Sequence, residues 1–346
     1  MASKPTLNRM RKAANQFISC RDIEDVATLI MVPKRQLVLH SFEPDYYTFQ
    51  VPKRGGKMRT IEAPVAKLMA VLRKLNFYLQ CVYYFIKPAP SYGYILTPKR
   101  AHAPRNILTH AECHLHCHYM LNVDFEDFFH QVSQEDTRKL LEQHPFRLAK
   151  SAANTLAKLC TYQGRLPMGS PTSPVFSNLA TVNLDQEVWQ WAKSQRMKYT
   201  RFVDDITLSA SQPIKLETLW HLTALCKKHN FQLNPSKTKF YEEEDTKIVT
   251  GLQVGSTVSI PKAFFQVLDH DLERLQKTVE VSTMLEGNRT ADFIKRYKQQ
   301  VHGKINFIGM IRGYRDEMYQ KYIEQYEQAI DPEVEVLSLH WMDFPY

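Results

Sequence analysis

The chain has no long hydrophobic run. None of its segments approaches the roughly eighteen consecutive apolar residues that span a membrane, and no charged segment followed by an apolar core marks a secretion signal. We therefore expect a soluble intracellular protein without a membrane partner. Its first acidic residue is Asp22, after Lys4, Arg9, Arg11 and Lys12. Organellar transit peptides have this composition, but a basic arm that binds phosphate predicts it equally, and we favour the arm.

Cysteine is scarce and irregularly placed. The six thiols do not form the spacing pattern of a disulfide framework in a chain of 346 residues. They are Cys20, Cys81, Cys113, Cys117, Cys160 and Cys226. Reduced thiols fit the cytosol. Internal repeats and low-complexity tracts are also lacking.

Acidic residues are outnumbered by basic ones. The chain holds 45 Lys and Arg against 36 Asp and Glu, giving a formal net charge of +9. Such a balance indicates a polyanionic partner, because a basic groove is the electrostatic footprint of nucleic-acid binding. The length allows two or three domains with a sizeable core. Residues 331–346 contain no Lys or Arg and are predicted to be an acidic tail.

The hydrophobic pattern predicts a mixture of helices and strands. The predicted elements are helices at 1–45, 64–86, 134–162, 215–229 and from 261 onward, β-hairpins at 46–64 and 198–210, a strand-like segment at 232–241 and a loop at 87–104. A further helix is expected after Pro174.

Three aspartates carry the strongest chemical signal. Asp124 ends the apolar run that begins at Leu121, and Asp204 and Asp205 follow eighty residues later between β-forming residues. A hairpin with Val203 and Asp204 near its tip would aim Asp204 at the strand that carries Asp124. Sparse carboxylates suit Mg²⁺, and two such ions about 3.5 to 4 Å apart serve nucleotidyl transfer. We therefore predict a two-magnesium site, against the alternative of a solvated turn and a helix cap.

The order of three segments resembles motifs A, B and C of reverse transcriptases. These segments are Asp124, then Leu166-Pro167-Met168-Gly169, then Phe202-Val203-Asp204-Asp205. The resemblance covers roughly residues 46–329. It implies an α+β right-hand polymerase with fingers, a palm built on an antiparallel sheet with helices, and a helical thumb.

The resemblance also divides the chain into domains. It implies an N-terminal helical extension at 1–45, fingers at 46–118 with a second fingers segment at about 131–165, a palm at 119–257 and a thumb at 258–330, followed by the tail at 331–346.

Site roles follow from the same resemblance. The carbonyl of Phe125 would join the aspartates as a metal ligand. Lys57 and Arg59, on a glycine turn, would bind the triphosphate of a dNTP. Phe129, five residues after Asp124, would be the steric gate against the ribose 2′-hydroxyl. Alternating faces of a strand leave open whether Phe129 or its neighbour Phe128 is buried.

Motifs B and D add further candidates. Met168 stands where the family has glutamine, which removes an amide near the nucleotide, so fidelity and nucleotide affinity are expected to change while polymerisation survives. Gly169 still permits a tight backbone there. Asn234-Pro235-Ser236-Lys237-Thr238 resembles motif D, in which Lys237 could protonate the leaving pyrophosphate or simply contact phosphate. Lys239 is the other candidate for that role.

Two further segments resemble markers of retron reverse transcriptases. Val249-Thr250-Gly251 matches the family's Val-Thr-Gly triplet, and His110-Ala111-Glu112-Cys113-His114 matches its Asn-Ala-x-x-His marker except at His110. Retron membership implies recognition of a structured non-coding RNA, with His114 and residues 249–251 contributing. It implies priming from a guanosine 2′-hydroxyl, copying into branched msDNA, and an effector partner in antiphage defence in the bacterial cytoplasm.

Other functions remain open from the residues alone. A group II intron-like or stand-alone defence reverse transcriptase would share the motifs but use another primer. A catalytically silent RNA-binding module would keep the fold, although the intact aspartates argue against it. His110, Cys113, His114 and Cys117 would share one helical face, but a tetrahedral zinc site usually needs ligands from a second element. We predict no zinc there.

Overall fold

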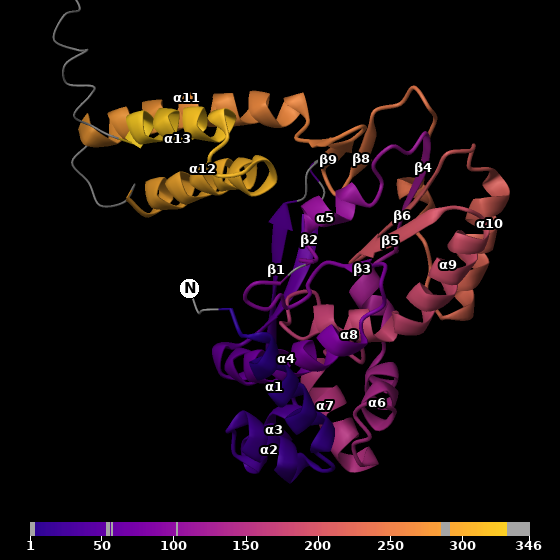
Figure 1. Ribbon diagram of the computed structural model, residues 1–346. Coiled ribbons are helices and arrows are strands. Elements are labelled where there is room, and N and C mark those ends of the chain that lie inside the picture. Colours follow the sequence, from indigo (N-terminus) through magenta and orange to yellow (C-terminus); the bar gives the residue numbers. More distant parts are fainter. Residues whose placement is uncertain (1–3, 53–55, 57, 102, 285–290, 331–346) are drawn as a thin grey trace, which may run out of the picture. The chain divides into compact units, whose positions relative to one another are not determined.

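A computed structural model describes residues 4–52, 56, 58–101, 103–284 and 291–330 (Figure 1). The chain divides into two compact units, residues 1–250 and 251–346. Among the described residues no helix is both long and apolar enough to cross a membrane.

The first unit begins with the predicted helices, α1 Leu7–Ser19, α2 Ile23–Ile30 and α3 Lys34–Phe42. Thr6 caps α1 by accepting from the Arg9 amide, and Asp22 forms a capping box at the start of α2, which satisfies otherwise unpaired N–H groups. Met10 and Phe17 are buried as α1 packs on α4, Ala66–Ile86. The helical prediction for this region is confirmed.

The predicted hairpin at 46–64 is confirmed as well. Strands β1 Tyr46–Pro52 and β2 Met58–Pro64 pair antiparallel from Tyr46↔Pro64 to Pro52↔Met58. Because Pro64 closes this ladder, α4 begins at Ala66 rather than at the proline. The predicted nucleotide ligand Lys57, with Lys53 and Arg54, lies outside the described residues.

The core of the first unit is a five-stranded sheet in the order β3-β5-β6-β4-β7. Its strands are β3 Ser91–Tyr92, β4 Tyr119–Asp124, β5 Lys198–Phe202, β6 Asp205–Ala210 and β7 Lys239–Tyr241. Neighbouring strands run antiparallel except β3 and β5. Tyr199 and Arg201 on β5 bond to α9, Val182–Ser194, whereas Thr200 bonds to side chains at and just after α5, Ile107–Glu112. The sheet is therefore held from both faces.

Several predicted elements differ in detail. The helix expected at 134–162 is two helices, α6 Gln134–Glu142 and α7 Lys150–Cys160, because Pro145 in between cannot continue α6. The strand-like segment at 232–241 reduces to β7, since Asn234 and Pro235 start a 3₁₀ turn, Pro235–Lys237. The predicted loop at 87–104 contains β3, which forms by pairing with β5.

Other helices of this unit agree with the prediction. The segment after motif B forms α8 Ser173–Ala180 and then α9, and α10 Leu216–Lys228 follows the β5–β6 hairpin. Strand β8, Lys247–Val249, closes the unit.

The second unit is mainly helical, as predicted from residue 261 onward. After the hairpin of β9 Leu252–Val254 and β10 Val258–Ser259 come α11 Lys262–Met284, α12 Ala291–Arg312 and α13 Glu317–Ile330. Apolar side chains at helical spacing form its core. They include Leu268, Leu272, Leu275, Val279, Val301, Ile305 and Ile308.

Candidate active site

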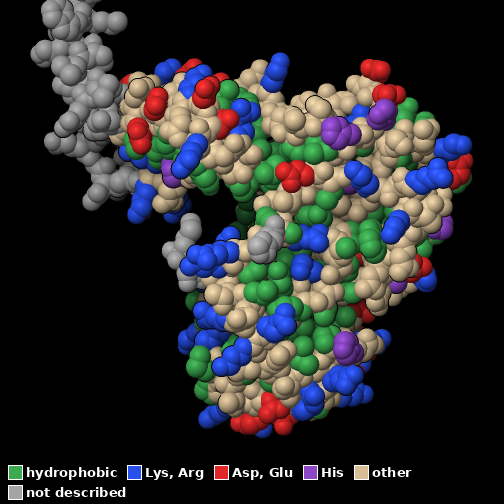
Figure 2. Space-filling view, in the orientation of Figure 1, with side chains coloured by type: hydrophobic (Ala, Val, Ile, Leu, Met, Phe, Trp, Pro, Cys, Tyr) green, Lys and Arg blue, Asp and Glu red, His purple; other side chains and the backbone are tan. Residues whose placement is uncertain are grey.

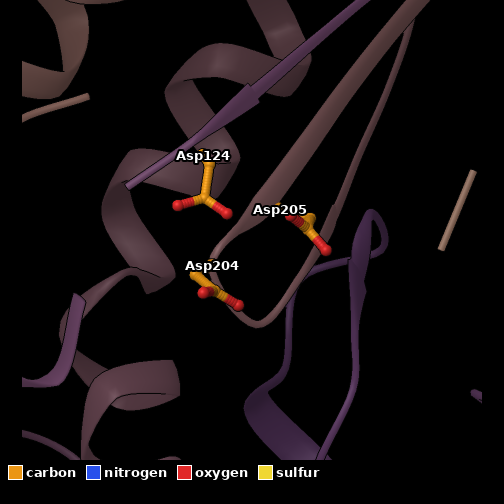
Figure 3. A group of neighbouring side chains, drawn as sticks. All are labelled: Asp124, Asp204 and Asp205. Carbon is orange, nitrogen blue, oxygen red and sulfur yellow. The ribbon is translucent and has the colours of Figure 1, made fainter. Parts of the chain in front are cut away.

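The sheet brings the three predicted aspartates together. Strand β4 ends at Asp124, and the antiparallel register places Asp205 directly opposite. Asp204 lies at the tip of the β5–β6 hairpin, where its carbonyl accepts from the Phe125 amide at 3.0 Å. One carboxylate oxygen from each aspartate lies within 4.8 Å of the others (Figure 3). The predicted hairpin and its aim at Asp124 are confirmed.

The triad concentrates negative charge. Burial, and then the charge of Asp124, raise the pKa of Asp204 above its ordinary value. The pKa of Asp205 is also raised, mainly because its carboxyl group is partly removed from water and secondly because of the charge of Asp204. Lys237 donates to Asp124 Oδ1 at 2.6 Å and supplies one compensating charge. Three ionised carboxylates would still repel one another, so the site favours a bound cation.

These donors fit Mg²⁺. Carboxylate oxygens are hard ligands, and Asp205 remains exposed, which allows the ion to keep several waters. Asp124, by contrast, is only 7% exposed and is fixed by the sheet. Two ions, and a contribution from the carbonyl of Phe125, stay predictions.

The candidate sugar gate lies in a short helix. Residues Phe128–Gln131 form a 3₁₀ helix, so the expectation of alternating strand faces is wrong. Phe128 is buried and stacks on Phe125 at 4.9 Å between ring centroids, whereas Phe129 remains half-buried. The geometry assigns the core role to Phe128 and leaves the gate role to Phe129 as a prediction. Arg59 lies on β2 opposite Val51 and is exposed.

The motif B loop is fastened to β2. The Glu62 amide donates to the Met168 carbonyl at 2.7 Å, and a Cβ on Gly169 would come within 2.7 Å of the Glu62 carbonyl oxygen. Gly169 also has φ +140°, a conformation open to glycine. The close approach explains why a glycine follows Met168.

A buried carboxylate strengthens that junction. Both oxygens of Glu62 accept from Arg165 at 2.9 Å. Burial raises the pKa of Glu62, but the hydrogen bonds and charge of Arg165 outweigh it and hold the pKa below its ordinary value. Sequence reasoning missed this pair. The available signal was a charged residue in a strand that otherwise turns apolar toward its end.

The two retron-like markers meet in the structure. Thr200 Oγ1 lies 2.7 Å from Nε2 of both His110 and His114, and His114 Nδ1 lies 2.7 Å from Ser209 Oγ. His110 Nδ1 lies 3.3 Å from Thr250 Oγ1, which joins the first marker to the Val-Thr-Gly triplet. Burial lowers the pKa of His110 to about 3 and that of His114 well below its ordinary value. Both imidazoles are therefore neutral.

The thiols of the same region have other neighbours. Cys113 Sγ lies 3.0 Å from the Tyr92 hydroxyl, and burial raises the pKa of Cys117, which disfavours a thiolate. The predicted absence of zinc stays a prediction.

The Val-Thr-Gly triplet forms a tight turn. Val249 is buried, and both Thr250 and Gly251 have positive φ. The roles of Val249, Thr250 and Gly251 in RNA recognition stay predictions.

A largely antiparallel sheet that gathers three aspartates at the end of its central strands defines the palm of a nucleic-acid polymerase. Residues 51–310 match the family model described as reverse transcriptase (RNA-dependent DNA polymerase), and the chain belongs to that family. The predictions of a right-hand α+β fold and of a retron-type reverse transcriptase are confirmed.

Several curated proteins are similar to this chain. Retron Ec86 reverse transcriptase of Escherichia coli is 28% identical over 232 residues, covering 66% of this chain and 69% of its own. Retron Mx65 reverse transcriptase of Myxococcus xanthus is 25% identical, and the match covers 77% of this chain and 61% of the Mx65 enzyme. The chain thus spans less than two thirds of the Mx65 enzyme. Among solved structures, a telomerase from Candida albicans has a TM-score of 0.44 at 13% identity, covering 83% of this chain and 60% of that one.

Proposed function

We propose that this RNA-directed DNA polymerase copies a cognate structured RNA into branched msDNA, starting from an RNA 2′-hydroxyl. We further propose that it acts in the bacterial cytoplasm with an effector protein in antiphage defence. The observation that carries the polymerase function is the convergence of Asp124, Asp204 and Asp205 within 4.8 Å on the palm sheet.

The proposed catalytic roles combine the motif resemblance with the positions of the side chains that the structure describes. The three aspartates would hold two Mg²⁺ ions, which when bound neutralise charge on the attacking and leaving oxygens. Lys237 lies beside Asp124, and despite partial burial this neighbour raises its pKa, so the ammonium is charged. It can donate a proton to the leaving pyrophosphate or bind its phosphate. Lys57 and Arg59 would bind the incoming triphosphate.

The remaining roles concern the base and the sugar. Met168 and Gly169 would lie against the nucleobase of the incoming dNTP, because the motif B loop that carries them is fixed to β2 through Glu62. Phe129 would exclude a ribose 2′-hydroxyl. We retain residues 46–118 with 131–165 as fingers, 119–257 as palm and 258–330 as thumb, after an extension at 1–45 and before a tail at 331–346.

Two observations support recognition of RNA. The bond between His110 and Thr250 joins both retron-like markers in one place. Exposed cations also line α1, where Arg9 and Arg11 lie over the rings of Phe77 and Phe85 on α4. Figure 2 shows lysine and arginine side chains gathered over the α1–α4 part of this face. Such a surface suits RNA phosphates, and folded RNA is recognised largely by shape and 2′-hydroxyl contacts.

The test of the function is to sequence the nucleic acid that copurifies with the protein and to treat it with a debranching enzyme. The wild-type protein, expressed with its neighbouring non-coding RNA, should carry DNA joined to RNA, and a debranching enzyme should convert the product to a linear species. The Asp204→Asn variant keeps its size but loses a charge, so it should fold and yield no DNA.

Other outcomes have clear meanings. DNA synthesis by Asp204→Asn at the wild-type level would refute the assignment of the triad. Linear DNA insensitive to debranching, already in early products formed in vitro, would indicate an intron-like or stand-alone reverse transcriptase. RNA without any DNA would indicate a silent RNA-binding module.

A further inference from the structure

The loop of the β5–β6 hairpin has a strained backbone. Phe202 pairs with Asp205, which leaves Val203 and Asp204 as a two-residue loop. Val203 has φ +60°, and Asp204 is not among the residues with positive φ. This is the pattern of a type II′ turn, whose first position glycine usually occupies. Valine is β-branched and disfavours the left-handed conformation, so contacts around the turn must hold it.

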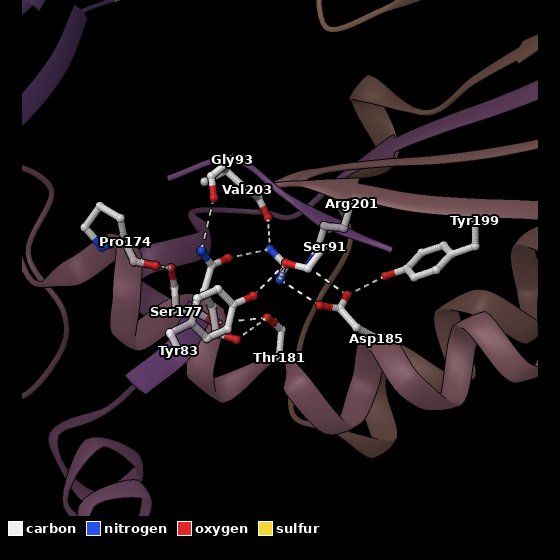
Figure 4. A network of polar contacts seen from close by, with 11 residues as sticks. Tyr83, Ser91, Gly93, Pro174, Ser177, Thr181, Asp185, Tyr199, Arg201 and Val203 are labelled. Carbon is white, nitrogen blue, oxygen red and sulfur yellow. Dashed lines mark hydrogen bonds and ion pairs between the residues drawn. The ribbon is translucent and has the colours of Figure 1, made fainter. Parts of the chain in front are cut away.

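Arg201 holds the turn from within the unit. Its Nη1 donates to the Val203 carbonyl at 2.6 Å (Figure 4). On the other side, the Val203 amide donates to the Tyr92 carbonyl at 3.3 Å. Gly93 approaches so closely that a Cβ there would lie 2.6 Å from Val203 Cγ2. The turn that carries Asp204 is therefore clamped between the β3 region and the guanidinium.

Every N–H group of that guanidinium has an acceptor. Nε and Nη2 donate to the two carboxylate oxygens of Asp185 at 2.9 and 2.8 Å. Nη1 also donates to Asn178 Oδ1 at 3.1 Å, and Nη2 to Ser91 Oγ at 3.3 Å. With the Val203 carbonyl, these bonds use all the donors of the arginine fork. A lysine ammonium cannot reproduce this planar set.

The arrangement is buried, and its ion pair carries no net charge. Arg201 and Asp185 are both 0% exposed, and Asn178 is 1% exposed. The carboxylate cancels the charge of the guanidinium at short range, so the pair acts on the active site chiefly through the Val203 carbonyl. Asn178 also donates to the Gly93 carbonyl at 3.2 Å, which ties both sides of the clamp to α8.

We propose that Arg201 is a positioning residue for DNA synthesis. It stabilises the left-handed conformation of Val203 and thereby places Asp204 against Asp124 and Asp205. Its consequence for catalysis rests on the proposed function. A purely structural ion pair would contribute stability without a specific effect on the aspartates, and this difference can be measured.

The test is a double-mutant cycle in the full-length chain, with Arg201→Lys, Val203→Gly and both together. Mn²⁺ binding is followed by electron paramagnetic resonance, and kcat and the dNTP KM by extension of a DNA primer on an RNA template. Arg201→Lys should weaken Mn²⁺ binding and lower kcat about tenfold to hundredfold, with KM nearly unchanged, because misplacement of a catalytic group acts on the chemical step.

The glycine background separates positioning from packing. Glycine adopts positive φ without strain, so in Val203→Gly the change Arg201→Lys should reduce Mn²⁺ affinity and kcat by only about threefold or less. Equal losses in both backgrounds would overturn the proposal.

Tyr199→Phe is the matched control. It removes a 2.7 Å hydrogen bond to the same Asp185 without touching Val203. We expect a lower unfolding midpoint with wild-type Mn²⁺ affinity and kcat. A loss of Mn²⁺ affinity as large as that of Arg201→Lys would show a general packing effect and refute the positioning role.

A second pair of variants covers the case in which Arg201→Lys does not fold. Arg201→Met with Asp185→Leu replaces the ion pair by apolar side chains, which buried pairs often tolerate. Its Mn²⁺ affinity is then compared with and without Val203→Gly. A smaller loss of affinity in the glycine background supports the proposal, and equal losses in both backgrounds overturn it. A wild-type protein that extends no primer would refute the proposed function, whereas the Mn²⁺ cycle still tests Arg201.

Discussion

At the scale of single residues, the 3₁₀ helix after β4 separates two adjacent phenylalanines. Phe128 is 4% exposed and stacks on Phe125, while Phe129 is half-buried. Sequence alone left open which of the two was buried, because either could pack under a strand. The helix settles which ring is buried, and of the two only Phe129 keeps the free surface that a sugar gate would need.

We predict that Phe129→Ala admits ribonucleotides. Removing the ring opens space where a 2′-hydroxyl would otherwise collide, so the preference for dNTPs over rNTPs should fall about tenfold or more, a typical effect of a changed pocket wall. The measurement is kcat/KM for each nucleotide in primer extension.

Phe128→Leu serves as the control for that change. It should lower the unfolding temperature, since the ring lies in the core, and leave sugar discrimination unchanged. If Phe129→Ala kept the wild-type preference, the gate would have to be another residue.

At the scale of elements, the sequence predicted the strands that a local pattern defines but not the strand that forms only by pairing with a distant segment. The hairpins at 46–64 and 198–210 were predictable because alternation and turn residues lie within each segment. Strand β3 was not, since two residues become a strand only by pairing with Arg201 and Phe202. The triad positions were visible as motifs. The contacts that fix the surrounding backbone were not visible. Glu62 meets Arg165 beside the motif B loop, and Asp185 meets Arg201 beside the turn of Asp204, only in the folded chain.

The neutral histidines in and just after α5 predict a pH dependence of stability. His110 has a pKa of about 3 in the folded chain, whereas an exposed histidine titrates near about 6.5. Between these values the unfolded chain binds a proton that the folded chain does not, so stability is full above pH ~6.5 and falls as the pH drops toward 3. The slope is about 1.4 kcal/mol per pH unit for each such histidine.

The variant His110→Asn isolates this contribution. Asparagine is the residue of the retron marker at this position and does not titrate. Denaturant unfolding between pH 4 and pH 6 should show a slope lower than that of the wild type by about 1.4 kcal/mol per pH unit. Other groups cancel in the comparison. Identical slopes would mean that His110 is protonated equally in both states.

At the scale of the whole molecule, net charge predicts how RNA binding responds to salt. With a net charge of +9 and exposed cations on α1, binding should release several counterions. We predict that Arg11 and Lys12 each contact an RNA phosphate, so Arg11→Gln with Lys12→Gln should reduce the slope of log K against log salt by about 1.4 to 1.8. Filter binding of the cognate RNA at a series of salt concentrations measures it.

Lys228→Gln provides the comparison. Lys228 is an exposed cation on α10 that already pairs with Glu187 at 2.6 Å, so its removal should leave the salt slope unchanged. Equal effects of the two changes would show that the slope reports total charge rather than contacts of α1.

The division of the chain at Thr250 also concerns the order of synthesis on the ribosome. The three aspartates, Lys237 and the Arg201 clamp all lie in the unit that ends there. At about 5 to 20 residues per second, the ribosome needs on the order of 5 to 20 s to make residues 251–346. During that interval the nascent chain already contains every strand of the five-stranded sheet. The catalytic centre can therefore begin to assemble before α11, α12 and α13 have been translated.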